Sequence, residues 1–223
     1  SIDNSKDNQK PKAQKIALER KTKMRKAAII ATFLFGLSVL GLQLIWIRIF
    51  KIYLTNTSYS FALISSLVIA GLFAGSWIYK SYSSLISSYR IVMTKALVLF
   101  GLFSALGLLL LMNMPEWIMF PFRDYLGNPF IKLIIMPMLA SLVVVLPPTI
   151  ISGFAFPLVC RMYTSGSEDV GKSVGKIIAV NAVGSVLGPL LTSFLLIPFL
   201  GVGVGIMVFV LLTLLIAIYI AFS

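Results

Sequence analysis

The sequence predicts an all-α, polytopic integral membrane protein with six transmembrane helices. Of its 223 residues, 59% are hydrophobic and only 12% are charged, which is about half the charged share of a soluble domain. The mean hydropathy is +0.99. Apolar runs of about 20 residues recur along the chain, and a helix rising about 1.5 Å per residue needs that length to cross roughly 30 Å of hydrocarbon.

Six apolar stretches meet this length criterion. They cover residues 27–50, 58–79, 91–114, 131–162, 174–199 and 202–222. The fourth is over-long and contains Pro147, Pro148 and Pro157, each of which removes a backbone donor and bends a helix. Neighbouring helices must then satisfy the freed carbonyls. The glycines of 201–205 indicate a tight connection that opens the sixth span.

The first 26 residues form a separate, basic segment in front of a membrane domain at 27–223. Nine of the 19 basic residues lie before Ala27. We expect the part before Pro11 to be disordered. From Ala13 the segment is either a basic helix lying on the membrane surface or a solvated tail. In both cases it is expected to contact anionic lipids.

The placement of basic residues predicts the orientation. With the N-terminus in the cytoplasm, the nine tail charges and six more near the second and fourth loops lie inside, and four lie outside. Both termini are then cytoplasmic, and the protein is a multi-pass protein of the cell (inner) membrane. The net charge of +12 is thereby explained by topology, so no nucleic-acid partner is expected.

No catalytic residue, cofactor or metal ligand set is predicted. The chain has no histidine and one cysteine, Cys160, which excludes an internal disulfide and argues against a zinc site. Residues 166–173 fit the pattern G-x-x-x-x-G-K-S, but an apolar helix precedes them where a P-loop needs a β-strand. We interpret them as a charged turn.

Small and polar residues on one helical face predict close helix packing. Asn181, Gly184 and Gly188 share a face of the fifth span, and Gly71 and Gly75 repeat the same G-x-x-x-G spacing in the second. An unpaired amide in hydrocarbon costs several kcal/mol. Asn181 is therefore expected either to donate to a proline-freed carbonyl of the fourth span or to bind a ligand.

A second polar group, Gln43, Trp46 and Arg48, lies at the outer end of the first span. It is either a polar pocket that faces the bundle interior or an interfacial anchor, with Trp46 in the aromatic belt and Arg48 snorkelling.

Two blocks of sequence resemble one known family. The first carries Gly36, Gln43, Trp46, Arg48, Ser58 to Ser60, and Gly71-x-x-x-Gly75, and the second carries Gly153, Pro157, Gly175, Asn181, Gly184 and Gly188. In this order they resemble the membrane domain fused to prokaryotic spermidine synthase-like (polyamine aminopropyltransferase) domains, whose helices are similar to one half of a major facilitator transporter.

The resemblance implies a function for the membrane part alone. The family's catalytic domain is Rossmann-like, and nothing in these residues corresponds to it, so the chain by itself is not expected to be an enzyme. It is expected to be a fragment or subunit of such a protein, or a stand-alone relative. Its implied role is a non-catalytic membrane anchor or scaffold that packs against a soluble aminopropyltransferase-like domain or another membrane subunit. The alternative is a half-size transporter or lipid-handling protein acting as a dimer.

Overall fold

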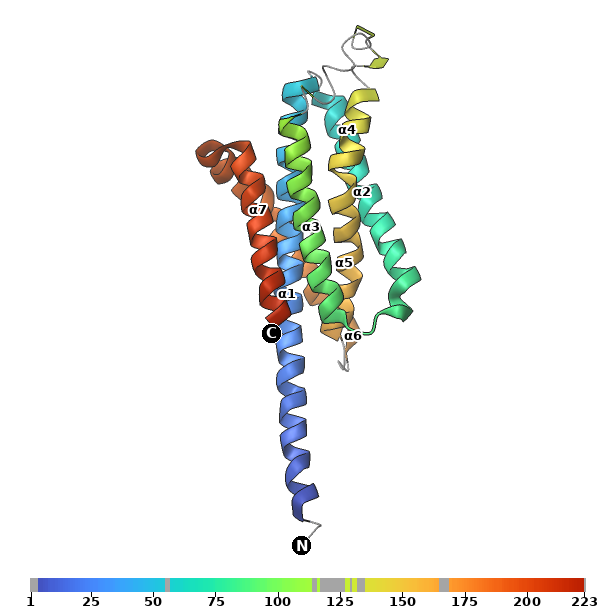
Figure 1. Cartoon of the computed structure of the whole chain (residues 1–223), viewed down its shortest axis with the longest axis vertical. Coiled ribbons are helices and arrows are strands. Elements are labelled where there is room, and N and C mark those ends of the chain that lie inside the picture. Colours follow the sequence, from blue (N-terminus) through green and yellow to red (C-terminus); the bar gives the residue numbers. More distant parts are fainter. Residues whose placement is uncertain are drawn as a thin grey trace.

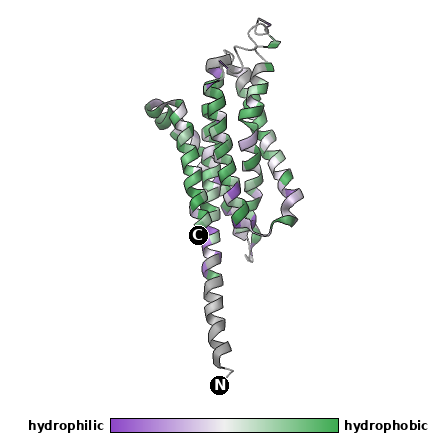
Figure 2. Cartoon of the chain, in the orientation of Figure 1, coloured by the Kyte–Doolittle hydropathy of each residue, from purple (hydrophilic) through white to green (hydrophobic). Residues whose placement is uncertain are grey.

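A computed structural model describes residues 4–54, 57–113, 116, 127–128, 130–131, 135–164 and 169–222 of the chain. These residues form a helical bundle, and none of them lies in a β-strand (Figure 1). Hydrophobic residues cover most of the length of the bundle (Figure 2). The prediction of an all-α membrane protein with several spans is confirmed at that level.

The described residues include seven longer helices. They are α1 (Asn4–Leu54), α2 (Thr57–Tyr82), α3 (Tyr89–Met112), α4 (Met136–Val144), α5 (Leu146–Thr164), α6 (Val170–Leu191) and α7 (Ile197–Phe222). A short 3₁₀-helix, Ser83–Leu85, precedes α3, and a π-helix, Thr192–Leu196, joins α6 to α7.

Four helical stretches in the described part are long and apolar enough to cross a membrane, and a bent pair is a fifth. The four are Lys21–Lys51, Phe61–Leu85, Tyr89–Met112 and Val170–Phe222, and the pair is Met138–Val144 with Leu146–Thr164. Length and composition therefore support four or five spans.

The N-terminal segment is continuous with the helix of the first predicted span. Helix α1 begins at Asn4 and continues without a break to Leu54, so the residues before Pro11 that are predicted to be disordered are helical from Asn4 onward. The helix also passes through the predicted boundary at Ala27. It leaves the bundle along its own axis instead of turning onto a surface (Figure 1). Strong helix formers such as Ala, Lys, Glu and Leu fill the stretch between Ala13 and Ala27, which favours extension of the membrane helix through it.

The predicted bend in the fourth span is confirmed. Helices α4 and α5 meet at Val145 with a 44° angle between them. Pro147 and Pro148 follow directly, and neither has an N–H to bond the carbonyl four residues earlier. The hydroxyl of Thr149 donates to the carbonyl of Val145 at 2.9 Å, so the first turn after the bend is stabilised by a side chain.

The predicted tight connection near Gly201 is also confirmed, because Gly201 has φ 78°, in the left-handed region that favours glycine.

Helices α6 and α7 both lie along α1. Helix α6 runs in the same direction as α1, since Gly184 lies near Phe33 and Gly188 lies near Leu37. Helix α7 runs in the opposite direction to α1, since Gly205 lies near Ile45 and Ile220 lines the same pocket as Ala27. The two helices therefore run in opposite directions along α1.

Helix α1 is the centre of the bundle. It packs against α2, α5, α6 and α7, and an edge-to-face pair of Phe35 and Phe100, with ring centroids 5.4 Å apart, joins it to α3. Helix α3 lies against α5 and α7. The largest fully buried side chains include Trp46, Phe50, Phe100 and Phe209.

Candidate functional site

Glycines bring the backbones of α1 and α6 into contact. A Cβ atom placed on Gly184 would collide with the carbonyl oxygen of Phe33, and one on Gly188 would collide with that of Leu37. On the facing helix, a Cβ on Gly36 would collide with the carbonyl of Asn181. Close approach of this kind is the usual basis of G-x-x-x-G packing in lipid.

A second backbone contact joins α2 to α5. A Cβ on Gly71 would collide with the side chain of Thr149, one on Gly75 with the carbonyl of Ile150, and one on Gly153 with the carbonyl of Leu72. The interface thus has glycines on both helices. The small-residue faces on the second and fifth spans are both occupied within this chain, by α5 and by α1.

One hydrogen bond crosses the α2–α5 interface. The Ser76 hydroxyl contacts the carbonyl oxygens of Leu72 at 2.9 Å, in its own helix, and of Gly153 at 3.0 Å, in α5. Pro157 lies four residues after Gly153 and has no N–H, so it leaves that carbonyl without its helical partner. Ser76 therefore satisfies the backbone group that the proline frees.

The two glycine-joined pairs enclose a cavity of about 380 Å³ between α1, α2, α5 and α6. Five of the lining residues have hydroxyl or amide side chains, and the others described are apolar or glycine. The polar ones are Thr32, Ser76, Ser152, Asn181 and Ser185. Thr32 is 1% exposed and its hydroxyl has no hydrogen-bond partner in the described part of the chain.

The chemistry of this cavity follows from its lining. No charged side chain lines it, so a bound ion would meet no countercharge in a medium of low dielectric constant. Hydroxyl and amide groups can donate to and accept from a neutral ligand. The arrangement is therefore suited to a small uncharged molecule that combines polar groups with apolar surface.

Asn181 lies in this cavity, but the hydrogen bond expected for it is absent. Among the residues that the structure describes, its side-chain amide has no hydrogen-bond partner, and the carbonyl freed by Pro157 is satisfied by Ser76 instead. The physical reason is proximity: the α2–α5 contact brings Ser76 within reach of Gly153, whereas Asn181 belongs to the α1–α6 contact.

The structure separates Gln43, Trp46 and Arg48. Gln43 donates from Nε2 to the hydroxyl of Ser65 in α2 at 3.1 Å. Trp46 is 1% exposed and packs in the core, so it is not part of an aromatic belt. Arg48 is exposed. The three side chains thus have three environments and do not form one pocket.

Where it is described, the P-loop-like stretch is the start of helix α6. Residues 165–168 lie outside the described residues. Asp169 is the N-cap of α6, and its carboxylate accepts a hydrogen bond from the backbone N–H of Lys172 at 2.9 Å. The carboxylate thus occupies the helix N-terminus, where a phosphate would have to bind.

Sequence reasoning did not predict four of the polar cavity residues, which are Thr32, Ser76, Ser152 and Ser185. A signal was present, because each cavity serine adjoins an interface glycine, in the pairs Gly75–Ser76, Ser152–Gly153 and Gly184–Ser185. Across the described residues, no group of three His, Cys, Asp or Glu side chains could hold a metal ion.

Comparison with known proteins adds no identification. No family model, no curated protein and no solved structure matches this chain. The functional interpretation therefore depends on the geometry described above and on the resemblance of the two sequence blocks.

Proposed function

We propose that the chain is a six-crossing domain of the cell (inner) membrane with both termini in the cytoplasm. The support is the opposite direction of α6 and α7 along α1, with the left-handed Gly201 between them. Helix α6 has 22 residues, and the part of α7 after the break at Gly201 runs from Val202 to Phe222 and has 21, so each is long enough for its own crossing. The distribution of basic residues favours the same orientation.

The role that best fits this geometry is a non-catalytic anchor and scaffold. The observation that carries the proposal is the direct backbone contact of α1 with α6 and of α2 with α5. These contacts are expected to make the four helices a rigid platform for a partner. Helix α1 extends this platform, because its 51 residues correspond to roughly 75 Å at about 1.5 Å per residue. It projects beyond the bundle at the end where the C-terminus of the chain also lies (Figure 1).

The partner follows from the resemblance. A soluble aminopropyltransferase-like domain would dock at the cytoplasmic end, beside the projecting part of α1. Another membrane subunit would dock on the apolar outer faces, where Phe73, Trp77 and Phe194 are exposed.

The test is the size and composition of the assembly after extraction from native membranes in a mild detergent. We expect a stable complex larger than one chain, containing either an aminopropyltransferase-like protein or a second membrane subunit. A chain that elutes alone or as a simple dimer, and that is stabilised thermally by a small molecule, would count against the scaffold.

The mid-bundle cavity favours a second candidate, a half-size transporter or lipid-handling protein that acts as a dimer. Its polar lining and its unpartnered Thr32 hydroxyl fit an uncharged or amphipathic ligand. We expect an uncharged diol, amide or monoacylglycerol from a test panel to raise the melting temperature of the intact chain. Asn181→Leu and Ser152→Ala should abolish that shift, and Ser81→Ala, outside the cavity, should preserve it. If no compound stabilises the chain, this candidate is rejected.

A further inference from the structure

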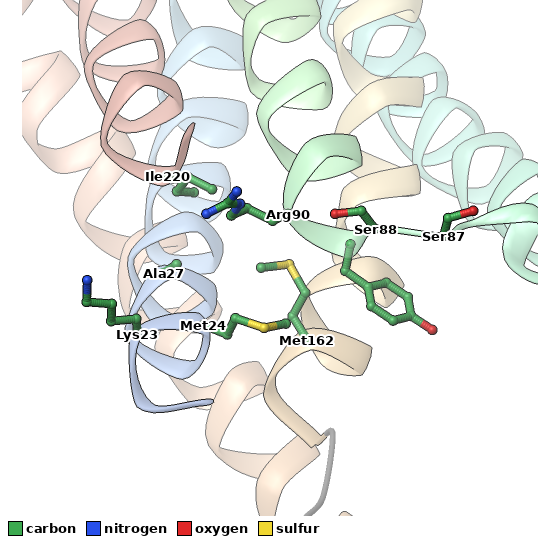
Figure 3. Close-up of a pocket in the computed structure, with 9 residues that line it drawn as sticks. Lys23, Met24, Ala27, Ser87, Ser88, Arg90, Met162 and Ile220 are labelled. Carbon is green, nitrogen blue, oxygen red and sulfur yellow. The ribbon is translucent and has the colours of Figure 1, made fainter. Parts of the chain in front are cut away.

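A second cavity lies at the end of the bundle from which α1 projects. Its volume is about 270 Å³ (Figure 3). Helix α1, the start of α3, α5 and the end of α7 all contribute to it. The lining residues are Lys23, Met24, Ala27, Ser87, Ser88, Tyr89, Arg90, Met162 and Ile220.

The cavity has a cationic rim. Lys23 from α1 and Arg90 from α3 both line it and are both exposed. Neither has an ion-pair partner within the described part of the chain. In Figure 3, the guanidinium group of Arg90 extends from α3 toward α1 and the end of α7. No acidic side chain lines the cavity, so two positive charges from different helices act on the same small volume.

The inner wall is apolar. Ala27, Met162 and Ile220 are each almost fully buried, and the thioether of Met24 lies beside them (Figure 3). Methionine side chains adapt their shape readily to an apolar guest. A free inorganic anion would use the rim and leave this wall in contact with water, whereas an amphiphile would use both.

The cavity lies where the apolar spans begin, which is the level expected for lipid headgroups. Ala27 is the point in α1 where the basic segment meets the apolar span, and Arg90 lies at the first turn of α3. Cationic pockets between transmembrane helices at this level are suited to phosphate headgroups. The hydroxyls of Ser87 and Ser88 add donors for phosphate oxygens.

We propose that this cavity binds the phosphate group of an anionic glycerophospholipid. Arg90 and Lys23 hold the phosphate, and the start of an acyl chain or the glycerol backbone packs against Met24, Met162 and Ile220. This is a defined site, distinct from diffuse attraction of the basic N-terminal segment to the membrane. It goes beyond the scaffold role and depends only on the chain being embedded in a bilayer.

The test uses the intact chain in a neutral detergent and measures binding by native mass spectrometry and by thermal stabilisation. The probes are phosphatidylglycerol, phosphatidylcholine and inorganic phosphate.

The double variant Lys23→Gln/Arg90→Gln removes the rim charges. The control Lys80→Gln/Lys95→Gln removes the same charge from exposed positions that do not line the cavity. A basic residue near anionic lipid contributes about a factor of five to the affinity. The affinity of the double rim variant for phosphatidylglycerol should therefore fall roughly 25-fold. The control should change little.

Three outcomes would overturn the proposal. One is unchanged lipid affinity in the rim variant, and another is an equal loss in the control, which would indicate diffuse attraction. The third is stabilisation by inorganic phosphate as strong as that by phosphatidylglycerol, which would reject a lipid ligand. Ala27→Leu provides an independent arm, since it fills the apolar wall and keeps both cations. It should weaken phosphatidylglycerol binding, and unchanged binding would contradict the seating of the lipid against that wall.

Discussion

One polar residue in this bundle, Ser76, is explained by a backbone group that a proline releases. Pro157 leaves the Gly153 carbonyl without an N–H, and Ser76 of the neighbouring helix bonds to it at 3.0 Å. The sequence indicated that such a carbonyl would need a partner. It did not identify Ser76, because the choice between Ser76 and Asn181 depends on which helix lies against that face of α5.

The bond predicts a specific coupling between two positions. Ser76→Ala should destabilise the chain by about 1 kcal/mol, the typical magnitude of an interhelical hydrogen bond in a membrane. In a Pro157→Ala background the loss should be smaller, because the new N–H can bond the Gly153 carbonyl within α5. The double-mutant cycle is measured by reversible unfolding in mixed micelles.

The control for this cycle is Ser81→Ala. Within the described part of the chain, the Ser81 hydroxyl donates to the carbonyl of Trp77 in its own helix, at 3.3 Å, so its removal should have little effect in either background. An equal loss from Ser76→Ala with and without Pro157 would contradict the assignment of Ser76 to the proline-freed carbonyl.

Between helices, glycine decides which faces can meet. The G-x-x-x-G spacing in α2 and α6 was visible in the sequence because it is local to each helix. The partner of each face was not visible, since either face could have served a second chain. In the structure, Gly188 faces Leu37 of α1 and Gly75 faces Ile150 of α5, so both are used inside the bundle.

Two glycines of the same helix provide a matched test of this packing. Gly188→Ala places a methyl group against the carbonyl of Leu37, so α6 must move away from α1. The melting temperature should fall, with a loss of about 1–3 kcal/mol as for other overpacked sites.

Gly175→Ala is the control, because nothing lies within 4 Å of a Cβ placed there. That change should be neutral or slightly stabilising, since alanine favours a helix more than glycine does. Similar melting temperatures for the two variants would show that the α1–α6 contact is looser than described.

For the whole molecule, the central question is the number of crossings. By composition Val170–Phe222 forms one apolar stretch of 53 residues, yet α6 and α7 follow α1 in opposite directions. The break in helical geometry lies at Gly201, shortly after the π-helix Thr192–Leu196. The proposed six crossings require two in this stretch and one in the bent α4–α5 pair.

Cysteine labelling in intact cells distinguishes the alternatives. In a Cys160→Ser background, Lys172→Cys and Phe222→Cys should react with a membrane-impermeant reagent only after the cytoplasmic side is exposed. Leu200→Cys, near the turn, should react from outside. If positions 172 and 222 are labelled from opposite sides, this stretch crosses only once and the six-span topology is wrong.

The sequence by itself determined the class of molecule, the apolar segments, the bend before Pro147 and the turn at Gly201. Each of these depends on hydrophobicity or on backbone chemistry within a few neighbouring residues. It also placed Asn181 among the residues that need a polar environment. The start of the chain is helical from Asn4 where disorder was predicted. Of the two roles predicted for Asn181, the described residues do not show the hydrogen bond, which leaves ligand binding as the remaining prediction.

Only the tertiary structure decided which helices meet, and therefore which polar groups share a space. The cavity formed by Thr32, Ser76, Ser152, Asn181 and Ser185 requires four helices at defined rotations about their axes. The same holds for Lys23 and Arg90, which are 67 positions apart in sequence and line one pocket. Such long-range placement results from steric fit between whole helix faces, and the periodicity of a single segment carries no information about the rotation of its neighbour.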